Sequence, residues 1–289
     1  MTRWYLFSLA SLIQYDFKAF YFAYVKSNCQ FFKMTAIFLN IVKYISLSFI
    51  CFTLSANAQE NFNHAEINGE ITCIFSNGIP EHEIGKFPNK ANPNKFKTQT
   101  LTFCFPSVPK LAETVSWEMM TVGVSATGIP IRPYTADYFD KNAKRGFSKN
   151  PSSGWRKQAM HDPRSLGIDS HNGHVDKTGL YHYHGIKRNL DTNKENVLLG
   201  YAPDGFKIFY NNDMTSSWRL KSGIRPTPPG GIHDGRFEED FEYLPKSGSL
   251  DECNGKEIDG VYTYFATNSY PFFPRCFKGK IHLKFMKRN

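Results

Sequence analysis

Short apolar runs, separated by glycine, proline and other turn-forming residues, characterise the chain after residue 58. The runs are rich in β-branched and aromatic residues, and most are too short to form a helix with a regular apolar face. This pattern predicts short strands joined by turns. The predicted strands cover residues 71–75, 100–105, 197–201, 206–210 and 261–266.

Helical periodicity is confined to a few stretches, of which residues 110–120 and 135–144 are the clearest. No change in composition, long linker or solenoid repeat divides residues 59–289, a length that suits one domain. We therefore expect a β-rich α+β fold, in which residues 59–289 form a single domain of many short strands with a few short helices.

A secretory signal peptide is predicted over residues 34–58. Lys43 precedes an apolar stretch at residues 44–54, and Ala56 and Ala58 form the small-x-small pattern of a cleavage site. Because the stretch is shorter than the about 20 residues of a membrane span, we expect cleavage after Ala58 and no stable membrane span in the mature form; a retained anchor is the alternative. The expected location is secreted, periplasmic or at the cell surface.

The residues before this segment show no helical or strand period. They are rich in aromatic side chains and carry a single acidic residue. We interpret residues 1–33 as an over-extended start, which makes Met34 rather than Met1 the initiator.

Four cysteines remain after the predicted cleavage: Cys73, Cys104, Cys253 and Cys276. An even number in an exported chain predicts two disulfides. Three pairings are possible, and we favour Cys73 with Cys104 and Cys253 with Cys276, because each closes a modest loop between strand-like segments. A four-thiolate zinc site is the alternative, but it needs close pairs such as Cys-x2-Cys, which the chain lacks.

Composition and charge narrow the classes of partner. The chain is 41% hydrophobic and 16% aromatic, which supports a buried core. Its formal net charge is +9, but no basic run is longer than two residues. Because a nucleic-acid groove needs clustered cations, we expect no nucleic-acid partner, and an unidentified extracytoplasmic ligand or substrate instead.

The most informative segment holds four histidines close together: His171, His174, His182 and His184. Side chains at i and i+2 of a strand share a face, so His182 and His184 would project together, away from the tyrosines that alternate with them. A turn at residues 176–179 would fold His171 or His174 back against this pair. Three or four imidazoles can then converge on one point.

Converging imidazoles suit zinc, copper, nickel or iron. We predict a metal site, with zinc or copper as the candidate ions and with His182 and His184 as the safest ligands, followed by His174 and then His171. Asp169 and Asp176 are candidate carboxylate ligands or acceptors that orient the rings. The alternative is a polar surface hairpin whose histidines merely alternate with packed tyrosines.

Three Asp-Gly pairs precede aromatic segments and predict turns. A hairpin turn is the simplest interpretation for Asp259 and Asp234. Asp204 lies between two predicted strands, where a loop carboxylate can point into a cleft. We therefore keep Asp204 as a candidate catalytic base.

Together these segments resemble the YHYH-domain family, named for the tetrapeptide that stands here at residues 181–184. The resemblance runs over residues 70–280 and implies a secreted or surface-exposed protein with a histidine site, but no settled activity. It also implies that His82 and Asp204 are site residues; His171 and Glu81 depart from the usual family pattern. The segments that carry it are 77–82, 167–169, 198–206, 234–235 with Asp240, 248–255 and 271–276.

Three functions remain open. The first is a secreted protein that sequesters or carries copper or zinc, with protein ligands in every coordination position. The second is a metal-dependent hydrolase, because a His-x-His strand with a third histidine locally resembles lysostaphin-type zinc endopeptidases, in which a base such as Asp204 or Asp176 would accept a proton from zinc-bound water. The third is a carbohydrate- or surface-binding module with tyrosine and phenylalanine stacking faces.

Overall fold

The computed structural model describes residues 60–117, 120–188, 190 and 195–288. These residues belong to one compact unit, Asn57–Asn289. The predicted start segment, signal peptide and cleavage site lie outside the described residues. Among the residues that are described, no helix has the length and apolar character needed to cross a membrane.

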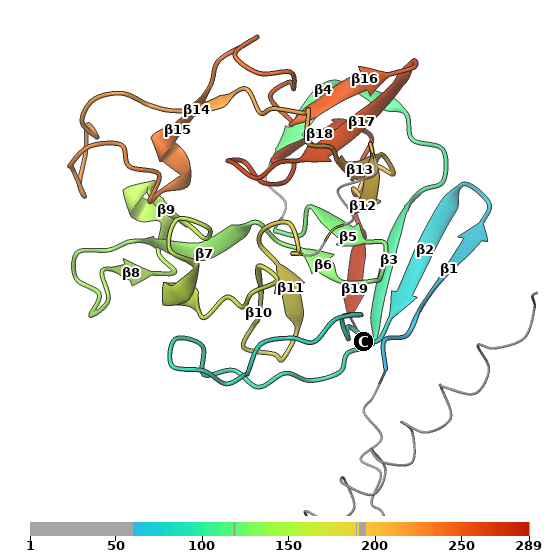
Figure 1. The fold of residues 1–289 in the computed structure, drawn as a ribbon, viewed down its shortest axis with the longest axis horizontal. Coiled ribbons are helices and arrows are strands. Elements are labelled where there is room, and N and C mark those ends of the chain that lie inside the picture. The colour runs from blue at the N-terminus through green and yellow to red at the C-terminus, as the bar shows by residue number, and fades with distance from the viewer. Residues whose placement is uncertain (1–59, 118–119, 189, 191–194, 289) are drawn as a thin grey trace, which may run out of the picture. The chain divides into compact units, whose positions relative to one another are not determined.

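The histidine segment lies at one edge of an eight-stranded sheet (Figure 1). Only two neighbouring pairs in this sheet are parallel, β11 with β6 and β13 with β17. In order across the sheet, the strands are β10 (Gly173–Val175), β11 (Tyr181–Tyr183), β6 (Pro130–Ile131), β5 (Gly123–Ser125), β12 (Val197–Tyr201), β13 (Lys207–Tyr210), β17 (Val261–Ala266) and β16 (Gly255–Ile258).

The two halves of this sheet share one arrangement of strands. Read from its centre outward, each half has an inner hairpin and then a parallel step to an outer hairpin. Residues 122–131 (VGVSATGIPI) align with residues 199–208 (LGYAPDGFKI). The turns match as well, since Ser125 N donates to Ile129 O at 2.8 Å and the equivalent Ala202 N donates to Phe206 O at 2.9 Å.

The outer hairpins, β10–β11 and β16–β17, repeat the same construction. Residues 169–173 (DSHNG) align with residues 251–255 (DECNG). Asn172 and Asn254, which occupy the same place, have φ angles of 60° and 59°. Because a non-glycine residue rarely adopts a positive φ, this agreement supports an internal duplication.

Smaller sheets flank the main sheet. One has the order β1 (Asn63–Asn68), β2 (Ile71–Ser76), β3 (Leu101–Pro106) and β19 (Met286–Arg288). Another has the order β8 (Phe147–Ser148), β7 (Tyr134–Phe139) and β9 (Arg156–Gln158). Two further pairs are β14 (Trp218–Leu220) with β15 (Phe241–Tyr243), and β18 (Cys276–Gly279) with β4 (Leu111–Trp117). Three short 3-10 helices complete the described part of the chain: η1 (Pro151–Ser153), η2 (Pro163–Leu166) and η3 (Glu238–Asp240).

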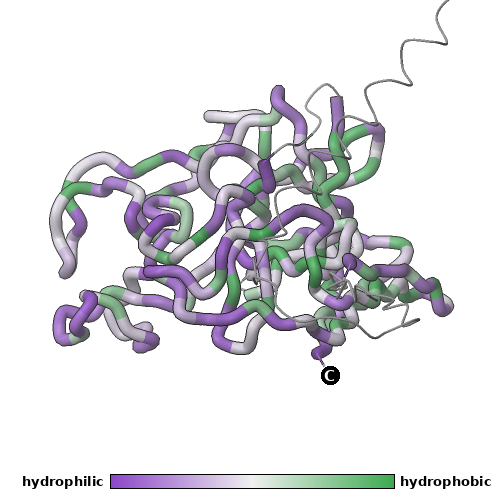
Figure 2. The backbone as a smooth tube through the Cα atoms, turned by 60° about the horizontal axis from the view of Figure 1, so that its bottom comes forward, coloured by the Kyte–Doolittle hydropathy of each residue, from purple (hydrophilic) through white to green (hydrophobic). Residues whose placement is uncertain are grey.

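The structure contains the two disulfides that the sequence favoured. Cys73 pairs with Cys104 across the β2–β3 register, and Cys253 pairs with Cys276. The second bond lies in the main hydrophobic core, where both cysteines are fully buried. Hydrophobic positions recur in short stretches between hydrophilic turns along the backbone (Figure 2), which is the pattern expected of many short strands.

The β-rich prediction is confirmed, but the helical content was overestimated. Residues 110–120 were expected to be helical, yet 111–117 form β4 and pair with β18. Residues 135–144 contain most of β7, which pairs with β8 and β9. In both cases pairing with a strand distant in sequence overrides a weak local helical preference.

Candidate metal centre

The β10–β11 hairpin brings three histidines to one point. His174 on β10 lies directly opposite His182 on β11, and His184 follows two residues after His182. Each ring offers one nitrogen to the cluster, and these three nitrogens lie within 4.8 Å of one another. His182 and His184 are 5% and 2% exposed, so the cluster is set into the protein.

The turn that sets this register is organised by Asp176. Its carboxylate accepts hydrogen bonds from the backbone N–H groups of Thr178 and Leu180, and it forms an ion pair with Arg132 at 3.1 Å. Gly179 has a φ of 90°, which glycine adopts without strain. Asp176 therefore fixes the hairpin, and in the described residues it is not one of the grouped ligands.

Backbone carbonyls anchor all three rings at Nδ1. His174 Nδ1 lies 2.9 Å from Leu166 O, His182 Nδ1 lies 3.2 Å from Leu180 O, and His184 Nδ1 lies 3.3 Å from Pro133 O. A carbonyl only accepts hydrogen bonds, so each Nδ1 carries the proton. Each neutral ring is then left with its lone pair on Nε2, which is the state that a metal ligand requires.

The distance between two of these Nε2 atoms fits a bound ion. Nε2 of His174 and Nε2 of His184 are 3.2 Å apart. Two nitrogens at zinc–nitrogen distances in a tetrahedral site are separated by about 3.3 Å. Because both atoms carry lone pairs in the anchored tautomers, they repel each other unless a cation lies between them. The residues present therefore fit a transition metal.

The electrostatics keep these rings neutral. Burial lowers the pKa of His174, and it holds the pKa values of His182 and His184 well below the usual 6.5, with the neighbouring histidines acting in the same direction. Neutral imidazoles are ready to bind a cation without first losing a proton.

The tyrosines of the motif face the opposite side of β11. Tyr181 OH donates to Asp169, whose carboxylate also accepts from the backbone N–H groups of His171 and Gly173. Tyr183 OH lies 2.8 Å from His82 Nε2, and the rings of His82 and His171 stack at 3.9 Å. The structure thus places Asp169, His171 and His82 on the tyrosine face, away from the three-histidine cluster.

Asp204 is also placed elsewhere. It is fully buried, and it accepts hydrogen bonds from Tyr264 OH at 2.6 Å and from the backbone of Gly279 and Phe206. No hydrogen bond or ion pair links it to the histidine cluster in the described part of the chain. Through these hydrogen bonds, Asp204 holds the β12–β13 turn against the core.

The second hairpin shows which of these features belong to the scaffold. Asp251 accepts from Cys253 N, Gly255 N and Tyr262 OH, as Asp169 does in the first hairpin. The histidine positions, however, are different: they hold Lys256, Thr263 and Phe265 in the copy. The hairpin therefore forms without histidines, so this fold does not require the three that stand in the first copy.

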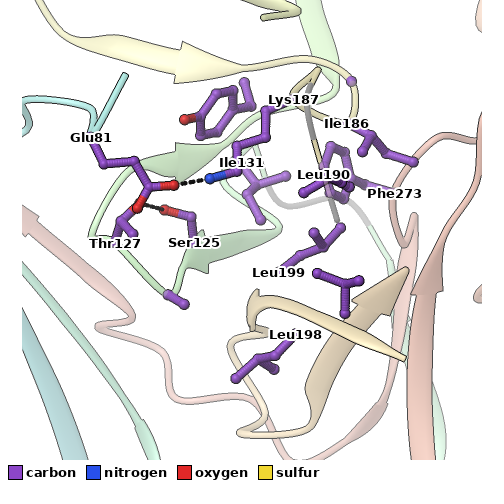
Figure 3. A pocket seen from close by; sticks show the side chains of 14 residues that line it. Glu81, Ser125, Thr127, Ile131, Ile186, Lys187, Leu190, Leu198, Leu199 and Phe273 are labelled. Atoms are coloured by element: carbon purple, nitrogen blue, oxygen red, sulfur yellow. Dashed lines mark hydrogen bonds and ion pairs between the residues drawn. The ribbon is translucent and has the colours of Figure 1, made fainter. Parts of the chain in front are cut away.

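Cavities flank the hairpin on both faces. One, of about 630 Å³, has His174 in its wall. The other, of about 320 Å³, includes Tyr183 in its wall and is lined mainly by apolar side chains (Figure 3). Lys187 and Glu81 form an ion pair beside this apolar cavity.

Sequence reasoning missed the groups that orient the rings. The acceptors are main-chain carbonyls at Pro133, Leu166 and Leu180, and a main-chain atom leaves no residue signature. The internal duplication, in contrast, can be detected in the sequence, because the segments DSHNG and DECNG match each other. Comparing the two copies would have assigned Asp169 to the scaffold.

Comparison with known proteins identifies the domain. A family model described as YHYH protein matches residues 102–279, which is more than half of the chain and includes the three histidines. Comparisons with curated proteins and with solved structures each give no match.

Proposed function

The chain belongs to the YHYH protein family, and we propose that it binds a divalent transition metal, zinc or copper, as an exported protein. The observation that carries this proposal is the convergence of three imidazoles, each anchored by a backbone carbonyl at Nδ1. This geometry is costly for free lone pairs and favourable around a cation.

The compartment follows from other observations. Two disulfides are compatible with an oxidising, extracytoplasmic location. The signal-like residues 34–58 support export with cleavage after Ala58. We therefore propose that the mature protein is secreted, periplasmic or at the cell surface.

The test is the metal content of the chain from Gln59 to Asn289, produced through an oxidising compartment. About one zinc or copper ion per chain is expected, and the His182→Ala/His184→Ala double variant should lose it. His64→Ala is the matched control, since His64 is an exposed histidine paired with Glu66 and should leave the metal content unchanged. A wild-type protein that is folded and rejects both metals would contradict the proposal.

A second candidate function, hydrolysis, is favoured by the number of ligands. The cluster in the described residues has three histidines and no carboxylate, and His174 borders a cavity. Three protein ligands and an open fourth position are typical of catalytic zinc sites, where the ion lowers the pKa of a bound water to about 7. A carrier is expected to fill every position with protein ligands.

The two functions are separated by turnover. For a hydrolase, ester or peptide hydrolysis should disappear with a chelator, return with zinc, and be absent in the His182→Ala/His184→Ala variant. For a carrier, metal binding should be tight in the wild type without any chelator-sensitive turnover.

A further inference from the structure

The cavity beside His174 combines charge with an unused hydrogen-bond donor. Its walls come from β7, β9, η2, the loop that precedes η3, and the segment around Asn92. The charged residues in its lining are three cations and two carboxylates: Arg145, Lys157, Arg236, Asp137 and Asp162.

The carboxylates do not cancel the cations. Asp137 already has a partner outside the lining, since Lys149 Nζ lies 2.7 Å from its Oδ1. Lys157 donates to a neutral group, Ser165 Oγ, at 2.8 Å. Arg145 forms no ion pair with any residue in the described ranges. Arg236 likewise pairs outside the lining, with Asp234 at 3.8 Å. With the Asp137 and Arg236 pairs set aside, Arg145 and Lys157 remain against one carboxylate, Asp162, so the cavity retains a net positive charge.

Gln158 supplies a donor with no partner. It lies on β9, lines the cavity and is 2% exposed. Its Oε1 accepts from His161 N at 2.7 Å, but its amide Nε2 has no hydrogen-bond partner. A buried amide N–H without a partner costs free energy, about 1–3 kcal/mol, and an acceptor that reached it from the cavity would remove this cost.

The charge of a metal ion at the histidine cluster would also favour an anionic ligand. Its three ligands are neutral imidazoles, so a divalent ion bound there keeps its full charge. Because electrostatic attraction is strong in a partly buried site, a cavity that reaches one of the three ligands, His174, favours an anion.

We propose that this cavity binds the oxyanion group of a substrate, a phosphate, sulfate or carboxylate, between the metal at His174 and the donors of Lys157, Arg236 and Gln158. This inference rests on the proposed metal site and names the class of compound that the site takes. The ligand is a small molecule or a polymer that carries such a group.

The experiment uses the exported chain loaded with cobalt, whose visible absorption reports ligand exchange. Metal content is measured first, and inorganic phosphate, sulfate and acetate are then titrated, with glucose as the neutral probe. At least one oxyanion should change the spectrum and glucose should not. Lys157→Gln and Arg236→Gln should each weaken binding about tenfold at unchanged metal content.

Gln158→Glu is the sharpest variant. It preserves size and replaces the unpartnered amide donor with a carboxylate that repels an anion, so it should weaken oxyanion binding by more than tenfold. Lys256→Gln is the matched control, because it removes an exposed cation at the equivalent of the His174 position in the second hairpin, and it should leave the affinity unchanged.

The outcomes separate this inference from the proposed function. A protein that holds cobalt but binds no oxyanion, or binds it equally well in all three cavity variants, overturns the inference and leaves the metal site standing. A folded protein that takes up neither cobalt, zinc nor copper overturns the proposed function. In that case, calorimetry with phosphate on the metal-free chain tests whether the cavity binds an oxyanion. Binding that Gln158→Glu removes supports the inference, and the absence of binding overturns it.

Discussion

His174 and His184 hold their Nε2 atoms 3.2 Å apart while a backbone carbonyl occupies the Nδ1 side of each ring. The carbonyl that holds His174 comes from Leu166 in η2, eight residues earlier, and the one that holds His184 comes from Pro133, 51 residues earlier. The rings are therefore oriented in advance of any ligand, which reduces the conformational entropy that metal binding would otherwise cost.

Asp169→Asn should separate a scaffold role from a ligand role. The carboxylate accepts from Tyr181 OH and from three backbone N–H groups, so its loss should lower the free energy of unfolding by about 1–3 kcal/mol. Urea unfolding measures this. Metal content should stay near one ion per chain, as in the matched Asp251→Asn variant of the second hairpin. Loss of the metal in the folded Asp169 variant alone would make Asp169 a ligand.

Gly173→Ala should loosen the metal hairpin. A Cβ there would lie 2.3 Å from the Tyr181 ring, so the ring must move, at a cost of about 1–3 kcal/mol. Gly255→Ala is the matched change, because its Cβ would lie 2.1 Å from Tyr262 OH. Both variants should unfold at lower urea concentration, and only Gly173→Ala should weaken metal binding in a competition with a chelator. Equal metal affinities in the two variants would contradict this expectation.

The duplication predicts that a second metal site can be built. In Lys256→His/Thr263→His/Phe265→His, the three new histidines occupy the equivalents of the natural ligands. The hydroxyl of Thr263 already donates to Val261 O at 3.4 Å, as His182 Nδ1 does to Leu180 O. Metal content should rise from one to two ions per chain.

The control for this graft is the same triple change in the His182→Ala/His184→Ala background, which should hold one ion. A folded triple variant that still holds a single ion would show that the hairpin backbone alone does not orient the ligands.

The acid stability of the protein should depend on Asp240. Its carboxylate is fully buried and accepts two hydrogen bonds from Arg225, both at 2.7 Å. Burial by itself raises the pKa of Asp240, but hydrogen bonds from Arg225 and from the backbone lower it below its ordinary value. Stability from this group is therefore present above pH 3.8 and is lost as the pH falls through the lowered pKa.

Asp240→Asn tests this by urea unfolding at pH 7 and at pH 3. Breaking a buried ion pair costs about 3–5 kcal/mol, so the variant should be less stable at pH 7. Its stability should also change less than that of the wild type between the two pH values. An identical pH dependence in the two proteins would exclude Asp240 as the titrating group.

Local patterns were sufficient for much of the fold. Strands predicted at 71–75, 197–201 and 261–266 coincide with β2, β12 and β17, because each alternates or concentrates apolar residues over a few positions between turns. Asp259 and Gly260 form the turn that joins β16 and β17, as the Asp-Gly signal indicates. The helical prediction at 110–120 failed because β18, more than 150 residues later, pairs with that segment.

The sequence by itself determined the histidine hairpin, since the i and i+2 spacing of His182 and His184 places both on one face of any strand and the turn at 176–179 returns His174 to them. It also determined the cysteine count that permits two disulfides. Only the tertiary structure decided which neighbouring residues join the site. Asp169, Asp176 and His171 lie as close in sequence as the ligands do, but they are directed to the turn and the tyrosine face. Pro133 O lies 51 residues before His184, and only tertiary packing brings it beside the cluster. Leu166 O and Gln158 come from η2 and β9 rather than from the hairpin.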